Sequence, residues 1–151
     1  MRGFLKFWLP VLIWMAIIFT ASSDSHSSEH SSRLFEPLLR WLFPHLPQDQ
    51  IEAIHHGFRK CCHLAEYAIL GLLVFRALGH SKNKLPTWSW PRMGGAVLVV
   101  FLYACSDEYH QRFVPTRTSQ FSDVIIDTIG ASIALLVVWI YHLYRRPKPQ
   151  P

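Results

Sequence analysis

The sequence predicts an all-α protein that forms a polytopic membrane four-helix bundle. Half of its 151 residues are hydrophobic, and they gather in four runs separated by polar, Pro-containing segments. A helix that crosses a bilayer needs roughly 17 to 25 mostly apolar residues. A soluble four-helix bundle is the alternative, but each of its helices would carry a polar stripe every three to four residues. The segment "VIIDTIGASIALLVVWIYHLY" has no such stripe after Thr128.

We expect a single domain, residues 1–151, with four membrane spans. Their approximate bounds are residues 4–22, 61–79, 93–109 and 124–144. The first and fourth spans meet the length requirement unaided. The second and third reach it only by including a few polar residues at one end.

The first apolar run also has features of a cleaved signal peptide. Arg2 and Lys6 give it a basic start, and "TASS" offers small residues for a protease. Its apolar stretch is long for a signal peptide, however, and Trp8 and Trp14 suit a retained helix. We therefore predict that it is the first membrane span.

The first loop, which follows this span, begins with a Ser- and His-rich stretch, "SSDSHSSEHSS". Apolar residues then recur at helical spacing from Leu34 to Phe43, with Ser32 as a candidate N-cap, so we expect an amphipathic helix in this outer loop. Pro44 ends it. A second helical piece from about Gln48 is expected to run straight into the second span.

Composition excludes several other classes of protein. The three cysteines, Cys61, Cys62 and Cys105, have no C-x-x-C spacing, which argues against a disulfide framework or a zinc knuckle. We expect them to be buried, inert thiols. The net charge of +5 does not indicate a nucleic-acid partner, because the basic residues lie beside apolar helices rather than in one basic patch.

The basic residues predict the orientation of the chain. Four spans place the N-terminus, the second loop and the C-terminal tail, residues 145–151, on one side. That side carries nine of the fifteen Lys and Arg residues in short segments. The positive-inside rule therefore predicts a multi-pass protein of the cell membrane with both termini in the cytoplasm.

With this orientation, all ten acidic residues lie on the outer side or in the outer ends of helices. Three of the predicted spans bring five carboxylates to about the same depth: Glu66, Asp107, Glu108, Asp123 and Asp127.

Helical spacing places these acids on common faces with other polar residues. His63, Glu66 and Tyr67 are spaced i, i+3, i+4. Asp107 and Gln111 are spaced i, i+4, as are Asp123 and Asp127. In the same way, Gly130 and Ala134 form a pair of small residues that permits close contact between helices.

A charged side chain in lipid costs about 2.5 to 3.5 kcal/mol on insertion scales, so it normally faces the bundle interior and a partner. The simplest interpretation is that the acids pair with Lys60, His63, Arg112 and Arg117 to hold the helices in register. Five acids are more than three spans need for pairing, so a second interpretation is a divalent cation site. His63, Glu66, Asp107 and Asp127 have the side-chain types that bind such a cation. A third interpretation is acid–base chemistry by a partly buried Glu66 or Asp107 beside His63.

At these residues the sequence resembles the VanZ-like family, named for a member that gives low-level resistance to the lipoglycopeptide antibiotic teicoplanin. The resemblance runs through "KCCHLAEYAILGLL" and "DEYHQRFVPTRTSQFSDVIIDTIG", and "SSDS" after the first span also fits. Asp127 stands where the family often has Asn. The matching motif positions are Lys60, His63, Tyr67, Gly71, Asp107, Glu108, Gln111, Pro115, Arg117, Asp123 and Gly130.

The resemblance implies a role in the cell envelope. Our hypothesis is an outward-facing site that binds or modifies the head group of a membrane lipid or a lipid-linked envelope component. Lys60 and Arg117 would hold an anion, Tyr67 and Gln111 would donate hydrogen bonds, and Asp123 and Asp127 would complete the binding site. The candidate catalytic or cation-holding residues are His63, Glu66, Asp107 and Glu108.

Two other classes of function stay open. The chain is a non-catalytic membrane scaffold or shielding protein if the polar cluster only holds the helices together. It is a small ion or proton carrier if a polar path reaches the cytoplasmic side, and the lack of acidic residues there counts against this.

Overall fold

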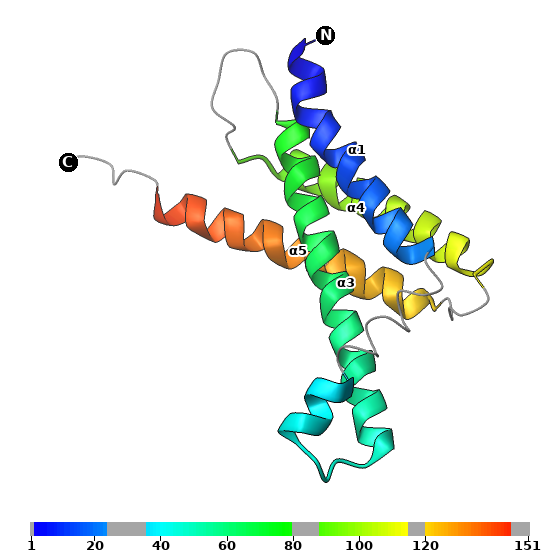
Figure 1. Cartoon of the computed structure of the whole chain (residues 1–151). Helices are drawn as coiled ribbons and strands as arrows, with labels where there is room; N and C mark the ends of the chain where they lie inside the picture. Colours follow the sequence, from blue (N-terminus) through cyan, green and yellow to red (C-terminus); the bar gives the residue numbers. More distant parts are fainter. Residues whose placement is uncertain (1, 24–35, 80–87, 115–119, 146–151) are drawn as a thin grey trace.

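The computed structural model describes residues 2–23, 36–79, 88–114 and 120–145, and this part of the chain is helical without a β-strand. A short helix spans residues 36–42. The four long helices, shown in Figure 1, are α1 (Arg2–Ser23), α3 (Gln48–Leu78), α4 (Trp90–Gln111) and α5 (Phe121–Tyr144). The all-α prediction is therefore confirmed for the described residues.

Three of the described helices are long and apolar enough to cross a membrane, namely α1 from Phe4 onward, α3 and α5. Helix α4 is as long as α1, with 22 residues. Its two ends, "WPR" and "SDEYHQ", are polar and lower its mean hydropathy. A span over residues 93–109 therefore stays a prediction.

Helix α3 is the longest helix and occupies the centre of the fold. The helical piece predicted from Gln48 does run into the second apolar run, as one helix of 31 residues. At 1.5 Å per residue it is about 46 Å long, against roughly 30 Å for a hydrocarbon core. Its length therefore carries it beyond the apolar layer.

Glycines allow α3 and α5 to cross at very close range. A Cβ atom added to Gly130 would lie 2.4 Å from the carbonyl oxygen of Leu64, and one added to Gly71 would lie 2.9 Å from the Cβ of Ala131. Figure 1 shows α5 crossing α3 near its middle. The close contact predicted at Gly130 is confirmed, and Ala131 is a further small residue of α5 that lies against α3.

Helix α1 is tied to its neighbours by side-chain hydrogen bonds to backbone carbonyls. The indole Nε1 of Trp14 donates to the carbonyl of Glu66 on α3, at 2.9 Å. The hydroxyl of Tyr103 on α4 donates to the carbonyl of Met15, at 2.6 Å. These bonds fix the height of α1 against α3 and α4.

The apolar residues of the four helices lie both inside and outside the fold. The core contains Val11, Leu70, Val100 and Leu135, one from each long helix. Large apolar side chains also cover the outer surface, for example Leu98, which is 57% exposed. This is the distribution expected of a protein that is solvated by lipid, because lipid leaves no reason to hide apolar side chains.

The predicted amphipathic helix of the first loop is present in part. The structure has it over residues 36–42, whereas Ser32, Leu34 and Phe35 lie outside the described residues. Leu39 is buried, and Trp41 is 76% exposed. The apolar face therefore only partly contacts the rest of the protein.

The prediction for the cysteines was wrong in one respect. All three are free thiols, as expected, but Cys61 is exposed, and Cys62 and Cys105 are only partly buried.

Candidate functional site

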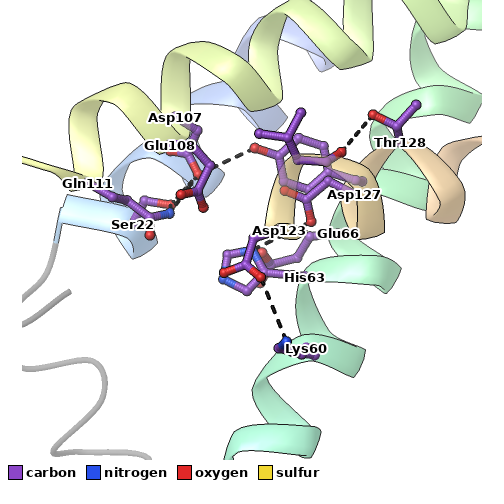
Figure 2. A network of polar contacts seen from close by, with 12 residues as sticks. Ser22, Lys60, His63, Glu66, Asp107, Glu108, Gln111, Asp123, Asp127 and Thr128 are labelled. Atoms are coloured by element: carbon purple, nitrogen blue, oxygen red, sulfur yellow. Dashed lines mark hydrogen bonds and ion pairs between the residues drawn. The ribbon is translucent and has the colours of Figure 1, made fainter. Parts of the chain in front are cut away.

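The predicted polar residues come together where α3, α4 and α5 meet the C-terminal end of α1 (Figure 2). Asp107 and Asp127 are 2% and 1% exposed, and Glu108 and Gln111 are nearly as buried, at 6% and 3%. Each of these groups comes from an otherwise apolar helix. The site divides into a closed part around Asp107 and an open part around Asp127.

The closed part is a set of hydrogen bonds to one oxygen of Asp107. Its Oδ2 accepts from the hydroxyl of Ser22 at 2.8 Å, the Nε2 of Gln111 at 3.1 Å and the hydroxyl of Tyr67 at 3.3 Å. The other oxygen, Oδ1, is buried and has no hydrogen-bond partner among the described residues. We name Ser22, Tyr67, Asp107 and Gln111 the Asp107 knot.

Sequence reasoning did not assign a role to Ser22. It is 2% exposed at the end of α1, and it joins a helix that has no acid of its own to the acid of α4. Two indications were present in the sequence: a polar "SSDS" follows an apolar helix at the height predicted for the acids, and the same stretch fits the VanZ-like family.

The open part is a cavity of about 60 Å³ between α3 and α5. Ten residues were predicted for the site, and five of them line this cavity. They are Lys60 and His63 from α3, Asp123 and Asp127 from α5, and Gln111 from the Asp107 knot. The full lining is His56, Arg59, Lys60, His63, Gln111, Gln120, Asp123, Ile126 and Asp127.

Opposite charges face each other across this cavity. The basic groups lie on α3 and the acids on α5, with Lys60 Nζ 3.9 Å from Asp123 Oδ1 and His63 Nδ1 3.9 Å from Asp127 Oδ1. Both distances exceed the range of a direct hydrogen bond. The two helices therefore attract each other without closing the space between them.

Four cavity residues were missing from the prediction: His56, Arg59, Gln120 and Ile126. Helical spacing was a usable indication for the first two, because His56 and Arg59 precede Lys60 and His63 by four residues each. Gln120 is the N-cap of α5 and lies outside the helical repeat, so spacing gave no indication of it.

The other predicted residues lie beside the cavity or outside the described residues. Glu66 and Tyr67 follow His63 on α3 but do not line the cavity. Glu108 Oε2 accepts a hydrogen bond from the backbone N–H of Gln120 at 3.0 Å, so it orders the start of α5. Arg117, predicted to bind an anion, lies outside the described residues.

The possibility of a divalent cation finds no geometric support in the described part of the chain. There, no group of three or more His, Cys, Asp or Glu side chains is arranged to hold a metal ion.

The comparisons with known proteins give one match. The family model described as VanZ/LLP1 matches residues 7–142. No curated protein and no solved structure matches the chain.

The matched region contains all four long helices almost in full, and both parts of the site lie within it. The match confirms the resemblance to the VanZ-like family. With apolar helices able to span a bilayer, this chain is a membrane protein of the VanZ family.

Proposed function

We propose that the protein crosses the cell membrane four times, with both termini in the cytoplasm and the polar site facing outward. There it binds or modifies the head group of an envelope lipid or glycan-lipid. The observation that carries this proposal is the charged cavity between α3 and α5, at the level where apolar helices become polar.

The charge distribution supports the topology. A four-span arrangement leaves the basic segments near Arg2, Arg92 and Arg145 on one side and every acidic residue on the other. Helix α4 contacts α3 and α5 and supplies Asp107 to the shared site. A span through α4 is the arrangement that brings its acid to the same depth as those of α3 and α5.

The cavity supports a role in binding a head group. The basic side chains of Arg59 and Lys60 suit the phosphate or other anion that envelope lipids carry. Asp123 and Asp127 would bind hydroxyl or amine groups of the same molecule. Because these side chains lie on helices that lipid surrounds, a lipid reaches them by moving within the leaflet.

The resemblance to the family's eponymous member leads to a cellular prediction. In a teicoplanin-sensitive host, the native chain would lower susceptibility to teicoplanin more than to vancomycin. Lys60→Gln would abolish this protection because it removes a cation from the cavity. The measurement is the minimum inhibitory concentration of both antibiotics at equal membrane levels of protein.

Arg40→Gln is the matched control for this experiment. It also removes one cation, but Arg40 lies in the short helix and pairs with Glu36 on the surface, at 3.0 Å. Protection that survives Lys60→Gln as fully as Arg40→Gln would contradict a role for the cavity. A native chain without any protective effect would mean that the phenotype does not extend to this protein.

The Asp107 knot favours a second candidate function, that of a non-catalytic scaffold. Three donors from three helices converge on a single buried oxygen, which is what a group that holds helices in register requires. In this version, deletion of residues 25–32 abolishes the phenotype, whereas Lys60→Gln has no effect. An enzyme would instead show turnover of an envelope lipid that Lys60→Gln abolishes at a normal protein level.

A further inference from the structure

We propose that the cavity between α3 and α5 takes a zwitterionic head group made of a phosphate diester and a primary amine. The amine lies at Asp127, and the phosphate lies at Arg59 and Lys60. This inference rests on the proposed function and narrows it to one class of ligand.

The deep end of the cavity needs a hydrogen-bond donor. Asp127 is 1% exposed, and its Oδ1 is buried without a hydrogen-bond partner among the described residues. The basic group that faces it from α3, His63 Nδ1, is 3.9 Å away. A buried carboxylate oxygen without a donor is unfavourable, and an ammonium group supplies both N–H donors and the opposite charge.

The mouth of the cavity has the opposite character. His56 is exposed, and Arg59 and Lys60 are partly exposed. The side chain of Lys60 is 37% exposed and only loosely paired with Asp123. An Arg fork beside a Lys suits phosphate oxygens. Charge therefore changes from basic at the mouth to acidic at the bottom.

The size of the cavity also fits an amine at the bottom and a phosphate at the mouth. About 60 Å³ is the space of roughly two water molecules, at about 30 Å³ for each in the liquid. An aminoethyl arm fits within it, and the phosphate remains at the mouth. In an aminoalkyl phosphodiester lipid the amine is the free end and the phosphate lies nearer the acyl chains. The ligand would thus enter with its amine first.

Single-charge ligands fit less well. A purely anionic head group would meet Asp123 and Asp127, which lie on the same face of α5 at i and i+4. A purely cationic ligand would have to pass Arg59 and Lys60. Only a ligand that carries both charges in the right order has a favourable partner at each end.

The test compares three lipids on the full-length chain in mild detergent by native mass spectrometry. Phosphatidylethanolamine, phosphatidylcholine and phosphatidylglycerol are supplied at equal concentration. Choline keeps the positive charge but has no N–H to donate to Asp127, and glycerol has no positive charge. We expect phosphatidylethanolamine to bind about tenfold more tightly than either, a difference that one charge-assisted hydrogen bond readily produces.

Variants assign the effect to the two ends of the cavity. Asp127→Asn should remove the preference for ethanolamine over choline. Lys60→Gln should weaken binding of the ethanolamine and glycerol lipids alike. Asp123→Asn is a second test of the acidic residues of α5. It is less apt to disturb folding than Asp127→Asn, because the Asp123 side chain is 26% exposed. Asp49→Asn and Arg40→Gln, both on exposed positions, are the matched controls, and helix content is measured by circular dichroism.

The remaining outcomes separate this inference from the broader function. Glycerophosphoethanolamine, which has no acyl chains, should displace phosphatidylethanolamine if the cavity also accepts a free phosphodiester. If the ligand reaches the cavity only from the membrane leaflet, the lipid binds and the free phosphodiester does not. Equal binding of choline and ethanolamine lipids, or a preference for glycerol, would overturn the inference and leave an anion-binding head-group site. Binding of all three lipids that Lys60→Gln leaves unchanged would overturn the head-group function as well.

Discussion

Asp107 and Asp127 are equally buried but have different surroundings. Asp107 accepts three hydrogen bonds at one oxygen, whereas Asp127 lines a cavity and faces His63 at 3.9 Å. A buried carboxylate needs donors to offset the loss of water. Asp107 finds donors for one of its two oxygens inside the protein, whereas Asp127 Oδ1 has none among the described residues and belongs to a residue that lines the cavity.

Ser22→Ala tests the structural role of the Asp107 knot. It removes the shortest of the three hydrogen bonds and leaves a buried carboxylate with fewer donors, so we expect a loss of about 1–3 kcal/mol in the free energy of unfolding. The measurement is thermal or denaturant unfolding of the protein in detergent.

Ser132→Ala is the control for this substitution. The Ser132 hydroxyl bonds the carbonyl of Thr128 in its own helix, at 2.8 Å, so its loss leaves no buried charge behind. Equal stability of the two variants would mean that Ser22 contributes nothing to holding Asp107.

Much of the site was predictable from residue type and spacing. Lys60, His63, Asp123 and Asp127 could be placed on facing helices because charged groups at i, i+3 and i+4 in an apolar helix must find partners inside the bundle. Ser22 could not be assigned in this way, because 85 residues separate it from Asp107. The cavity itself was also beyond prediction, since it depends on two pairs that stop at 3.9 Å.

At the scale of elements, the contact between α3 and α5 decides the geometry of the site. The crossing at Gly130 and Leu64 lies three residues from Asp127 on one helix and one residue from His63 on the other. A close crossing therefore sets the width of the cavity directly. The sequence predicted the close contact from small residues, but not which α3 backbone atom Gly130 would meet.

Gly130→Ala should be strongly destabilising. The added Cβ would lie 2.4 Å from a backbone oxygen that cannot rotate away, so the helices must separate. Insertion of a methyl group into a tight contact typically costs about 1–3 kcal/mol. We expect a lower unfolding temperature together with reduced lipid selectivity.

Gly94→Ala provides the contrast. It lies in α4 with no atom within 4 Å of an added Cβ, and Ala is favoured over Gly in a helix by about 1 kcal/mol. Its stability should be unchanged or higher. If both variants unfold alike, the close crossing of α3 and α5 is not essential to the fold.

At the scale of the whole molecule, apolar side chains cover the outside of the helices, and buried polar side chains gather where α3, α4 and α5 meet the end of α1. The overall helical content followed from composition, because half of the residues are hydrophobic and gather in long runs. The position of α4 did not follow in the same way, since α4 is the one long helix of the described residues that is not apolar enough over a sufficient length to be a candidate membrane span.

Reporter fusions test the four-span topology. Alkaline phosphatase should be active when fused after His30 or Arg117 and inactive after Lys84 or Pro151, while fluorescent protein should show the reverse pattern. The positive-inside distribution is the physical reason. An inactive phosphatase after Arg117 would show that α4 does not cross, and an active one after Pro151 would exclude a cytoplasmic C-terminus.

The contact of α3 with α5 also bears on how the chain is made. Ribosomal synthesis delivers α1, α3 and α4 before α5, yet α3 has its most extensive contact with α5. Until that last helix arrives, the α3 surface at Gly71 and Leu64 has nothing to meet, and His63 has no acid of α5 beside it. The nascent protein must therefore wait in the bilayer as an incomplete assembly, which makes unfinished chains natural substrates for membrane quality-control proteases.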